Sequence, residues 1–200
     1  MGFGLLLIGY ISVLGVYPNI NIYTYVWAAL IGIAGAIIAY FGACKLAEFG
    51  LFFRVFKVMT MAYIALVAIL GTSDVLGIND PESGAFAIFE GISLAVRILF
   101  LFAYHFILAT AIKNLAREVG NGKTERAAKR VLFASYVYFP LTLLPMFISV
   151  SQELLIVEIT AGLIYFGLNI VMLYSSFVRI TFEGHDEAVE AKHKKKSSSE

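Results

Sequence analysis

Long apolar segments, separated by short polar ones, divide most of the chain into six stretches. The apolar segments run over residues 2–17, 23–43, 55–70, 86–112, 131–150 and 154–178. They are continuous rather than alternating, which is typical of transmembrane helices and not of barrel strands. Since about 20 helical residues cross a hydrocarbon core of about 30 Å, most segments are long enough to span, although the first and third are short. The pattern predicts an all-α bundle of six transmembrane helices over residues 1–180 and a flexible cytoplasmic tail over residues 181–200.

The composition supports this prediction because the chain has too few polar residues to cover a water-exposed surface. Hydrophobic residues make up 60% of the 200 residues and charged residues only 14%. Soluble domains have roughly half and about a quarter, respectively. The single cysteine, Cys44, excludes a disulfide within one chain and a cysteine-only metal cluster.

The basic residues are distributed unevenly along the chain. All of them except Arg97 fall on one side of a six-span topology: Lys45, Arg54, Lys57, Lys113, Arg117, Lys123, Arg126, Lys129, Arg130, Arg179, Lys192, Lys194, Lys195 and Lys196. The other side carries the acidic residues Asp74, Asp80, Glu82 and Glu153. Because lysine and arginine favour cytoplasmic loops, both termini are expected in the cytoplasm of a multi-pass cell-membrane protein.

The segment 113–130 contains a glycine-rich run that resembles a phosphate-binding loop only superficially. The full motif needs a glycine five residues before Gly122, where this chain has Arg117, and no strand precedes the run. We therefore expect two helical extensions joined by a turn at Gly120 to Gly122, with Asn121 favouring the turn.

Small residues in the second segment recur at helical spacing. One stripe contains Ala28, Gly32 and Ala36, and another contains Gly35, Ala39 and Ala43. Such stripes allow helix backbones to approach closely, either within the bundle, which is the simpler interpretation, or at a homodimer face. The fifth segment contains Pro140 and Pro145, which remove backbone donors and are expected to kink it.

Ionisable residues inside membrane segments are costly and are therefore the candidate functional residues. The candidate polar cluster consists of Glu90, Arg97, His105, Glu158 and Asn169. One interpretation is structural, with Arg97 reaching the interface or pairing with Glu158. Another is an outward-facing cavity in which Arg97 binds an anionic group. A third is a proton relay through Glu158 and His105.

Nothing in the sequence places a nucleophile beside a base. Ser93 and His105 share a helix but lie about 18 Å apart at 1.5 Å per residue. No two histidines within a segment have metal-ligand spacing. No metal, cofactor or nucleic acid is expected, and an enzyme is the least supported class. The expected partners are the lipid bilayer and, in one hypothesis, a second membrane or cytoplasmic protein.

Two short runs carry a resemblance to known proteins. The opening residues 2–10 and the run 42–47 resemble small six-span integral membrane proteins of Gram-positive bacteria. That resemblance implies no activity and no site residues. The size and six-span layout are also similar to the substrate-binding subunits of energy-coupling vitamin transporters, which is an analogy of architecture.

Two functions fit these observations. The first is a small-molecule binding or transport component with an outward polar cavity around Arg97 and Glu158. The alternative is a non-catalytic membrane partner, scaffold or assembly factor that docks another protein through the basic segment 113–130 and the tail.

Overall fold

The computed structural model describes residues 2–14, 22–75, 84–144, 147 and 152–197, with most of their side chains but not those of Glu90 and Arg97. These residues form six α-helices and one 3-10 turn: α1 (Gly2–Leu14), α2 (Ile22–Leu46), η1 (Ala47–Phe49), α3 (Leu51–Val75), α4 (Gly84–Glu118), α5 (Gly122–Leu143) and α6 (Gln152–Ser197). The described part of the chain contains no strand. The predicted all-α class is confirmed.

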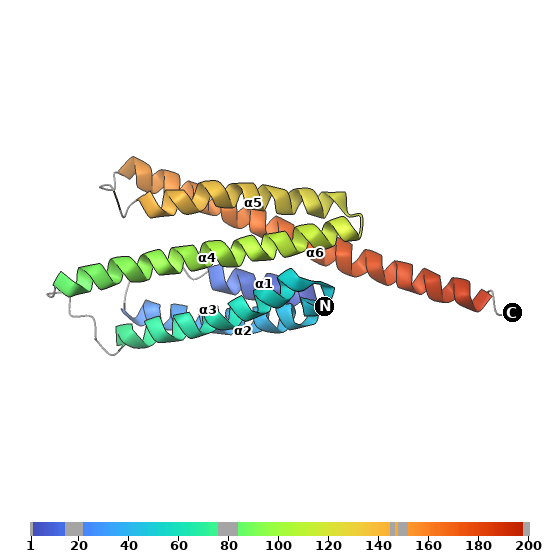
Figure 1. The fold of residues 1–200 in the computed structure, drawn as a ribbon, viewed down its shortest axis with the longest axis horizontal. Helices are drawn as coiled ribbons and strands as arrows, with labels where there is room; N and C mark the ends of the chain where they lie inside the picture. Colours follow the sequence, from blue (N-terminus) through green and yellow to red (C-terminus); the bar gives the residue numbers. More distant parts are fainter. Residues whose placement is uncertain (1, 15–21, 76–83, 145–146, 148–151, 198–200) are drawn as a thin grey trace.

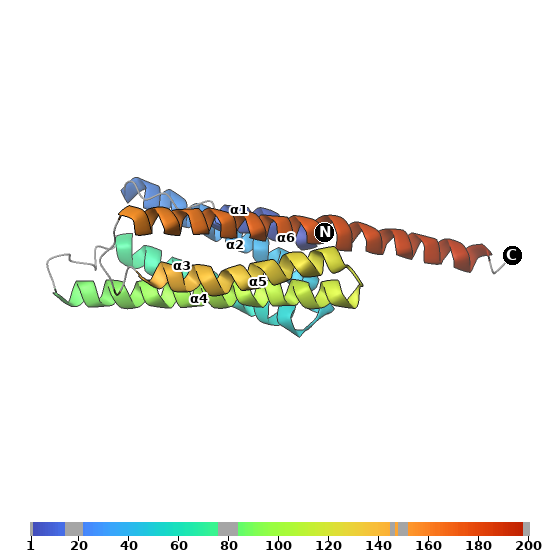
Figure 2. The ribbon, with the colours of Figure 1, turned by 90° about the horizontal axis from the view of Figure 1, so that it is seen from above.

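The six helices run up and down in turn and close into a ring. Each helix packs against the next one in the sequence, and α6 packs back against α1. The start of α1, the α2–α3 turn and the α4–α5 turn lie toward one end of the bundle, and α6 leaves the bundle at the same end (Figures 1 and 2). The basic residues that flank these two turns therefore gather at this end. Arg97, in the middle of α4, is not among them. We call this end the basic end.

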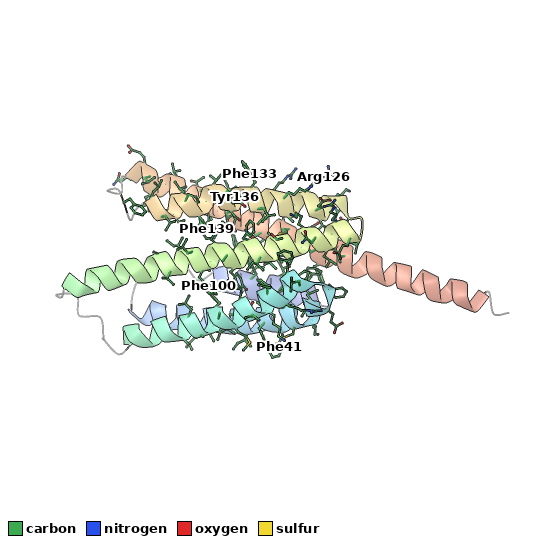
Figure 3. The ribbon with its side chains drawn as sticks, in the orientation of Figure 1. Phe41, Phe100, Arg126, Phe133, Tyr136 and Phe139 are labelled. Carbon is green, nitrogen blue, oxygen red and sulfur yellow. The ribbon has the colours of Figure 1, made fainter. Side chains whose placement is uncertain are left out.

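The outer surface of the bundle is apolar. Figure 3 shows Phe133 on the outer side of α5, where 73% of its side chain is exposed, whereas Phe139 is buried between helices. Three segments within the described residues are long and apolar enough to cross a membrane: Leu30–Phe49, Ile98–Glu118 and Gln152–Ile180. Exposed apolar side chains are stable only against an apolar solvent, so these features support a helical membrane protein.

The helix boundaries differ from the predicted apolar segments, most clearly in α3 and α5. α3 has 25 residues and extends past the third apolar segment at both ends, while that apolar segment itself is short. The fifth helix begins at Gly122 and ends at Leu143, whereas the apolar segment was predicted to run over 131–150. Pro140 lies inside α5 near its end, and Pro145 lies outside the described residues.

The sixth helix continues where the sequence predicted a flexible tail to begin. α6 runs without a break to Ser197 and projects past the basic end (Figure 1). The segment 186–195 is rich in Ala, Glu and Lys, which are strong helix formers. The prediction relied on polarity, and polarity alone does not distinguish an exposed helix from a disordered chain.

α1 and α2 touch through their backbones. A Cβ atom added at Gly9 would lie 2.5 Å from both Ala39 N and Gly35 O. Ala39 and Ala43 are fully buried. The stripe of Gly35, Ala39 and Ala43 therefore serves packing within the bundle, which was the simpler of the two interpretations.

The turn between α4 and α5 has the predicted form. α4 extends to Glu118 and α5 begins at Gly122, so both helical extensions are present. Gly120 has a φ of 73°, which favours glycine, and the Asn121 side chain accepts a hydrogen bond from Thr124 N at 3.1 Å.

Candidate functional site

His105 lies at the centre of the bundle with only 2% of its surface exposed. Its Nδ1 atom is 2.6 Å from the carbonyl oxygen of Leu101, one turn earlier on α4. Because a carbonyl oxygen only accepts, Nδ1 carries the proton in this bond. The neutral ring then presents Nε2 as a hydrogen-bond acceptor, and no atom of the described residues bonds to it.

Aromatic rings from four helices surround His105. Ring centroids lie at 5.3 Å for Tyr10 of α1, 5.6 Å for Tyr104 of α4, 5.8 Å for Phe139 of α5 and 5.7 Å for Tyr165 of α6. We call these residues, with Ser135 and Asn169, the tyrosine–histidine centre. Its packing requires four helices to meet at one depth, so it belongs to the tertiary fold rather than to any single helix.

Hydrogen bonds fix the α5 and α6 side of the centre. Ser135 Oγ donates to Val131 O at 2.9 Å and lies 3.0 Å from the hydroxyl oxygen of Tyr165. Since the serine proton is used on Val131, the Tyr165 hydroxyl is the donor between the two hydroxyls. Asn169 Nδ2 donates to Tyr165 O at 2.8 Å. Tyr165 is therefore held at both its ring and its backbone.

Three polar atoms of this centre make no hydrogen bond with the described part of the protein. They are the hydroxyl of Tyr10, Nε2 of His105 and Oδ1 of Asn169. All three side chains are almost completely buried. Leaving one such atom unpaired costs about 1–3 kcal/mol, and most buried polar atoms in native proteins are paired. The centre therefore offers two acceptors and one hydroxyl with unused bonding capacity.

The structure describes the side chains of three of the five residues of the candidate polar cluster, His105, Glu158 and Asn169. His105 contacts the ring of Tyr165, to whose backbone Asn169 is bonded. Glu158 lies on the same helix seven residues before Tyr165 and is partly buried. The side chains of Glu90 and Arg97 lie outside the described residues, so an Arg97–Glu158 ion pair stays a prediction.

Sequence reasoning missed Tyr10, Ser135, Phe139 and Tyr165 as neighbours of His105. The chain has 11 tyrosines and 17 phenylalanines, so an aromatic residue in an apolar segment carries almost no information by itself. One usable signal was the spacing of Tyr165 and Asn169, which places two polar side chains one turn apart on the same helix.

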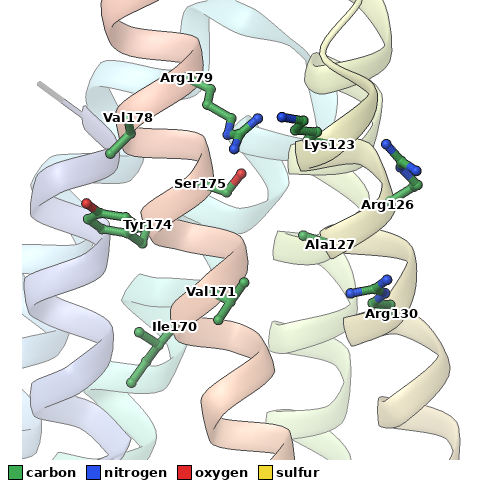
Figure 4. Close-up of a pocket in the computed structure, with 10 residues that line it drawn as sticks. All are labelled: Lys123, Arg126, Ala127, Arg130, Ile170, Val171, Tyr174, Ser175, Val178 and Arg179. Atoms are coloured by element: carbon green, nitrogen blue, oxygen red, sulfur yellow. The ribbon is translucent and has the colours of Figure 1, made fainter.

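A second site lies between α5 and α6 at the basic end (Figure 4). This groove has a volume of about 540 Å³. Its lining residues are Lys123, Arg126, Ala127, Arg130, Ile170, Val171, Tyr174, Ser175, Val178 and Arg179. Thr124 Oγ1 and Ser175 Oγ lie 2.9 Å apart and tie the two helices together beside the groove. We call it the basic groove.

One basic residue next to this groove is already neutralised. Lys129 Nζ lies 2.7 Å from Glu125 Oε1, one turn apart on α5. The hydrogen bond from Lys129 lowers the pKa of the Glu125 carboxyl below its ordinary value, so the pair stays charged at neutral pH. Both side chains are accessible to solvent, and the pair contributes little to stability.

The described residues contain no group of three or more His, Cys, Asp and Glu side chains that could hold a metal ion. Comparison with known proteins gave no match to any family model, curated protein or solved structure. Function is therefore inferred from the chemistry of the tyrosine–histidine centre and the basic groove.

Proposed function

We propose that the protein is a membrane-embedded binding or transport component for a small solute, which is bound at the tyrosine–histidine centre. The observation that carries the proposal is that three polar atoms in the buried middle of the bundle, on Tyr10, His105 and Asn169, make no hydrogen bond with the described residues. Buried polar groups inside membrane proteins commonly mark the path or binding site of a solute.

The proposal includes a six-span topology with both termini in the cytoplasm. Up-and-down packing of six helices and the gathering of basic side chains at one end support it. In this topology the tyrosine–histidine centre lies within the membrane and the basic groove lies at its cytoplasmic side.

The chemistry of the centre favours a solute that donates hydrogen bonds. Nε2 of His105 and Oδ1 of Asn169 only accept, while the Tyr10 hydroxyl does both. The surrounding tyrosine and phenylalanine faces are attractive to a cation. We therefore expect a neutral or singly cationic molecule with N–H or O–H groups, such as ammonium or a small amine or amide, rather than a carboxylate or a phosphate.

The packing of the centre also limits the size of the solute. The rings around His105 are in direct contact with it, at centroid distances of 5.3 to 5.8 Å, so even a small solute enters only where side chains move apart. A larger solute requires the helices to separate, as the helix bundles of transporters do when they alternate between two openings.

Thermal unfolding of the purified full-length protein with a panel of solutes tests the proposal. Small amines or amides are expected to raise the melting temperature of the wild type, and carboxylates and phosphate are not. His105→Phe and Asn169→Leu should remove the effect. Ser176→Ala is the matched control, because Ser176 is buried on α6 and its hydroxyl donates only to Met172 O. Stabilisation that survives in His105→Phe would contradict the proposed site.

The second candidate function is a non-catalytic membrane partner, and the projecting end of α6 favours it. Residues 181–197 continue the helix beyond the bundle, where they present a helical surface to a cytoplasmic protein. Deleting residues 181–200 separates the two functions. Solute-dependent stabilisation should persist if the protein binds a solute, whereas co-purification of a partner would be lost if the tail docks it.

A further inference from the structure

The basic groove carries positive charge on both of its walls. Lys123, Arg126 and Arg130 recur along one face of α5, and Arg179 faces them from α6. Figure 4 shows the side chains of Lys123 and Arg179 reaching toward each other across the gap, with the Ser175 hydroxyl beneath them. No acidic residue is among the described residues that line the groove. A multiply coordinated anion is the ligand that such an arrangement recognises.

The floor of the groove is apolar. It is formed by Ile170, Val171 and the neighbouring apolar side chains of α6, and Val171 is 58% exposed. A second hollow of about 370 Å³ begins at Lys129 and Arg130 and is lined on its far side by Phe133, Ala134 and Leu168. Arg130 is common to both hollows, so an apolar surface continues from the cationic rim along the length of the helices.

The depth of the groove matches the boundary between lipid headgroups and acyl chains. The apolar run of α6, residues 154–178, ends immediately before Arg179. Lys123 lies one residue into α5, and Phe133 lies about 15 Å further along that helix at 1.5 Å per residue. The cations therefore lie where a membrane surface would be, and the apolar hollow lies where acyl chains would be.

We propose that the basic groove binds one anionic phospholipid, with its phosphate between Lys123, Arg130 and Arg179. One acyl chain then covers Val171 and continues along Phe133 and Leu168. Basic pockets between transmembrane helices bind anionic headgroups in this way, and each lysine or arginine near the surface contributes to the attraction. A free phosphate or an acidic peptide would use the cationic rim but not the apolar hollow below it. This inference does not depend on the solute-binding function, because the two sites share no residue.

Lipid titration of the full-length protein tests the inference. The protein is delipidated in detergent and titrated with phosphatidylglycerol, phosphatidylcholine or acyl-free glycerol phosphate, and bound lipid is counted by native mass spectrometry. One phosphatidylglycerol is expected to bind preferentially and to raise the melting temperature. Arg130→Gln combined with Arg179→Gln should weaken that binding about tenfold or more, since each residue contributes a separate attraction.

The matched control is Lys45→Gln combined with Arg117→Gln. It removes the same net charge from exposed positions at the basic end that do not line the groove. The control should bind phosphatidylglycerol as the wild type does. If both double variants bound phosphatidylglycerol equally weakly, the loss would follow from the lower net charge alone. That result would overturn the proposed site. Equal binding of phosphatidylcholine would overturn the headgroup assignment, and equal stabilisation by glycerol phosphate would overturn the lipid assignment.

Discussion

At the residue scale, the centre of the bundle is defined by which hydrogen bonds are made and which are not. His105 and Asn169 each use one polar atom on a backbone carbonyl of their own helix, and the other atom has no hydrogen-bond partner among the described residues. The sequence predicted both as polar residues inside the membrane, because any such residue is rare and costly there. It did not predict the ring contact between His105 and Tyr165, because that contact depends on how α4 and α6 meet.

Two tyrosines of the centre should respond differently to removal of the hydroxyl. The Tyr165 hydroxyl bonds to Ser135, so Tyr165→Phe should lower the free energy of unfolding by about 1 kcal/mol. The Tyr10 hydroxyl is buried and unpaired, so Tyr10→Phe should leave the stability of the solute-free protein unchanged or raise it. Thermal unfolding in detergent measures both. A larger loss in Tyr10→Phe than in Tyr165→Phe would show that the Tyr10 hydroxyl has a partner within the protein.

The Arg97–Glu158 ion pair is a prediction that the backbone supports. α4 and α6 run in the same direction, and His105 and Tyr165 are in ring contact. Arg97 precedes His105 by eight residues and Glu158 precedes Tyr165 by seven, so the two positions have similar depth. An unpaired arginine at mid-membrane depth would cost about 2.5–3.5 kcal/mol on insertion scales, which pairing would offset.

A double-mutant cycle tests this pair. Arg97→Ala and Glu158→Gln should each destabilise the protein, because each leaves a charge without its partner. The double variant should cost less than the sum of the two, by roughly 0.5–3 kcal/mol as for residues in contact. Strictly additive losses in thermal unfolding would exclude the pair and the outward cavity built on it.

At the element scale, hydrophobic runs predicted the number and order of the helices but not all of their ends. A run of apolar residues indicates which part of a helix can face lipid. The helix continues past the end of that run when the residues that follow favour helix formation. α4 and α5 extend past their apolar runs as far as the cap at Asn121, and α6 continues through a polar tail. The predictions for α4 and the turn were right because they used turn chemistry, and the prediction for the tail differed because it used polarity alone.

Because α1 and α2 are in backbone contact at Gly9, adding a single methyl group there should strongly lower the stability of the protein. Gly9→Ala places a Cβ atom 2.5 Å from backbone atoms of α2, which cannot rotate away. Overpacking of this kind costs about 1–3 kcal/mol, against a gain in helix propensity of at most about 1 kcal/mol. Gly9→Ala should therefore lower the melting temperature. Gly167→Ala is the control, since no atom lies within 4 Å of its added Cβ, and it should be neutral or stabilising.

At the scale of the whole molecule, the ring of six helices separates an enclosed polar and aromatic site from a cationic site on the outer surface. The tyrosine–histidine centre is enclosed by the ring, and the basic groove lies at the outer boundary between its fifth and sixth members. The sequence contained the charges of the groove, but they come from positions 123 to 130 and position 179. These positions face each other because of how α5 and α6 are rotated about their axes when they pack, which spacing along the chain does not specify.

The last prediction concerns the orientation of the whole bundle. Three chain features meet at the basic end: the start of α1, the α4–α5 turn and the departure of α6 (Figure 1). From the positive-inside rule we expect this end in the cytoplasm, where no basic turn would have to cross the membrane during insertion. In a Cys44→Ser background, a cysteine at Lys123, which is exposed just after the turn, should react with a membrane-impermeant maleimide only when the cytoplasmic face is accessible. A fusion of alkaline phosphatase to the C-terminus should likewise be inactive, because that enzyme requires the oxidising exterior for its disulfides. Labelling of the Lys123→Cys variant in intact cells, or an active fusion, would invert the bundle and move the basic groove to the outer leaflet.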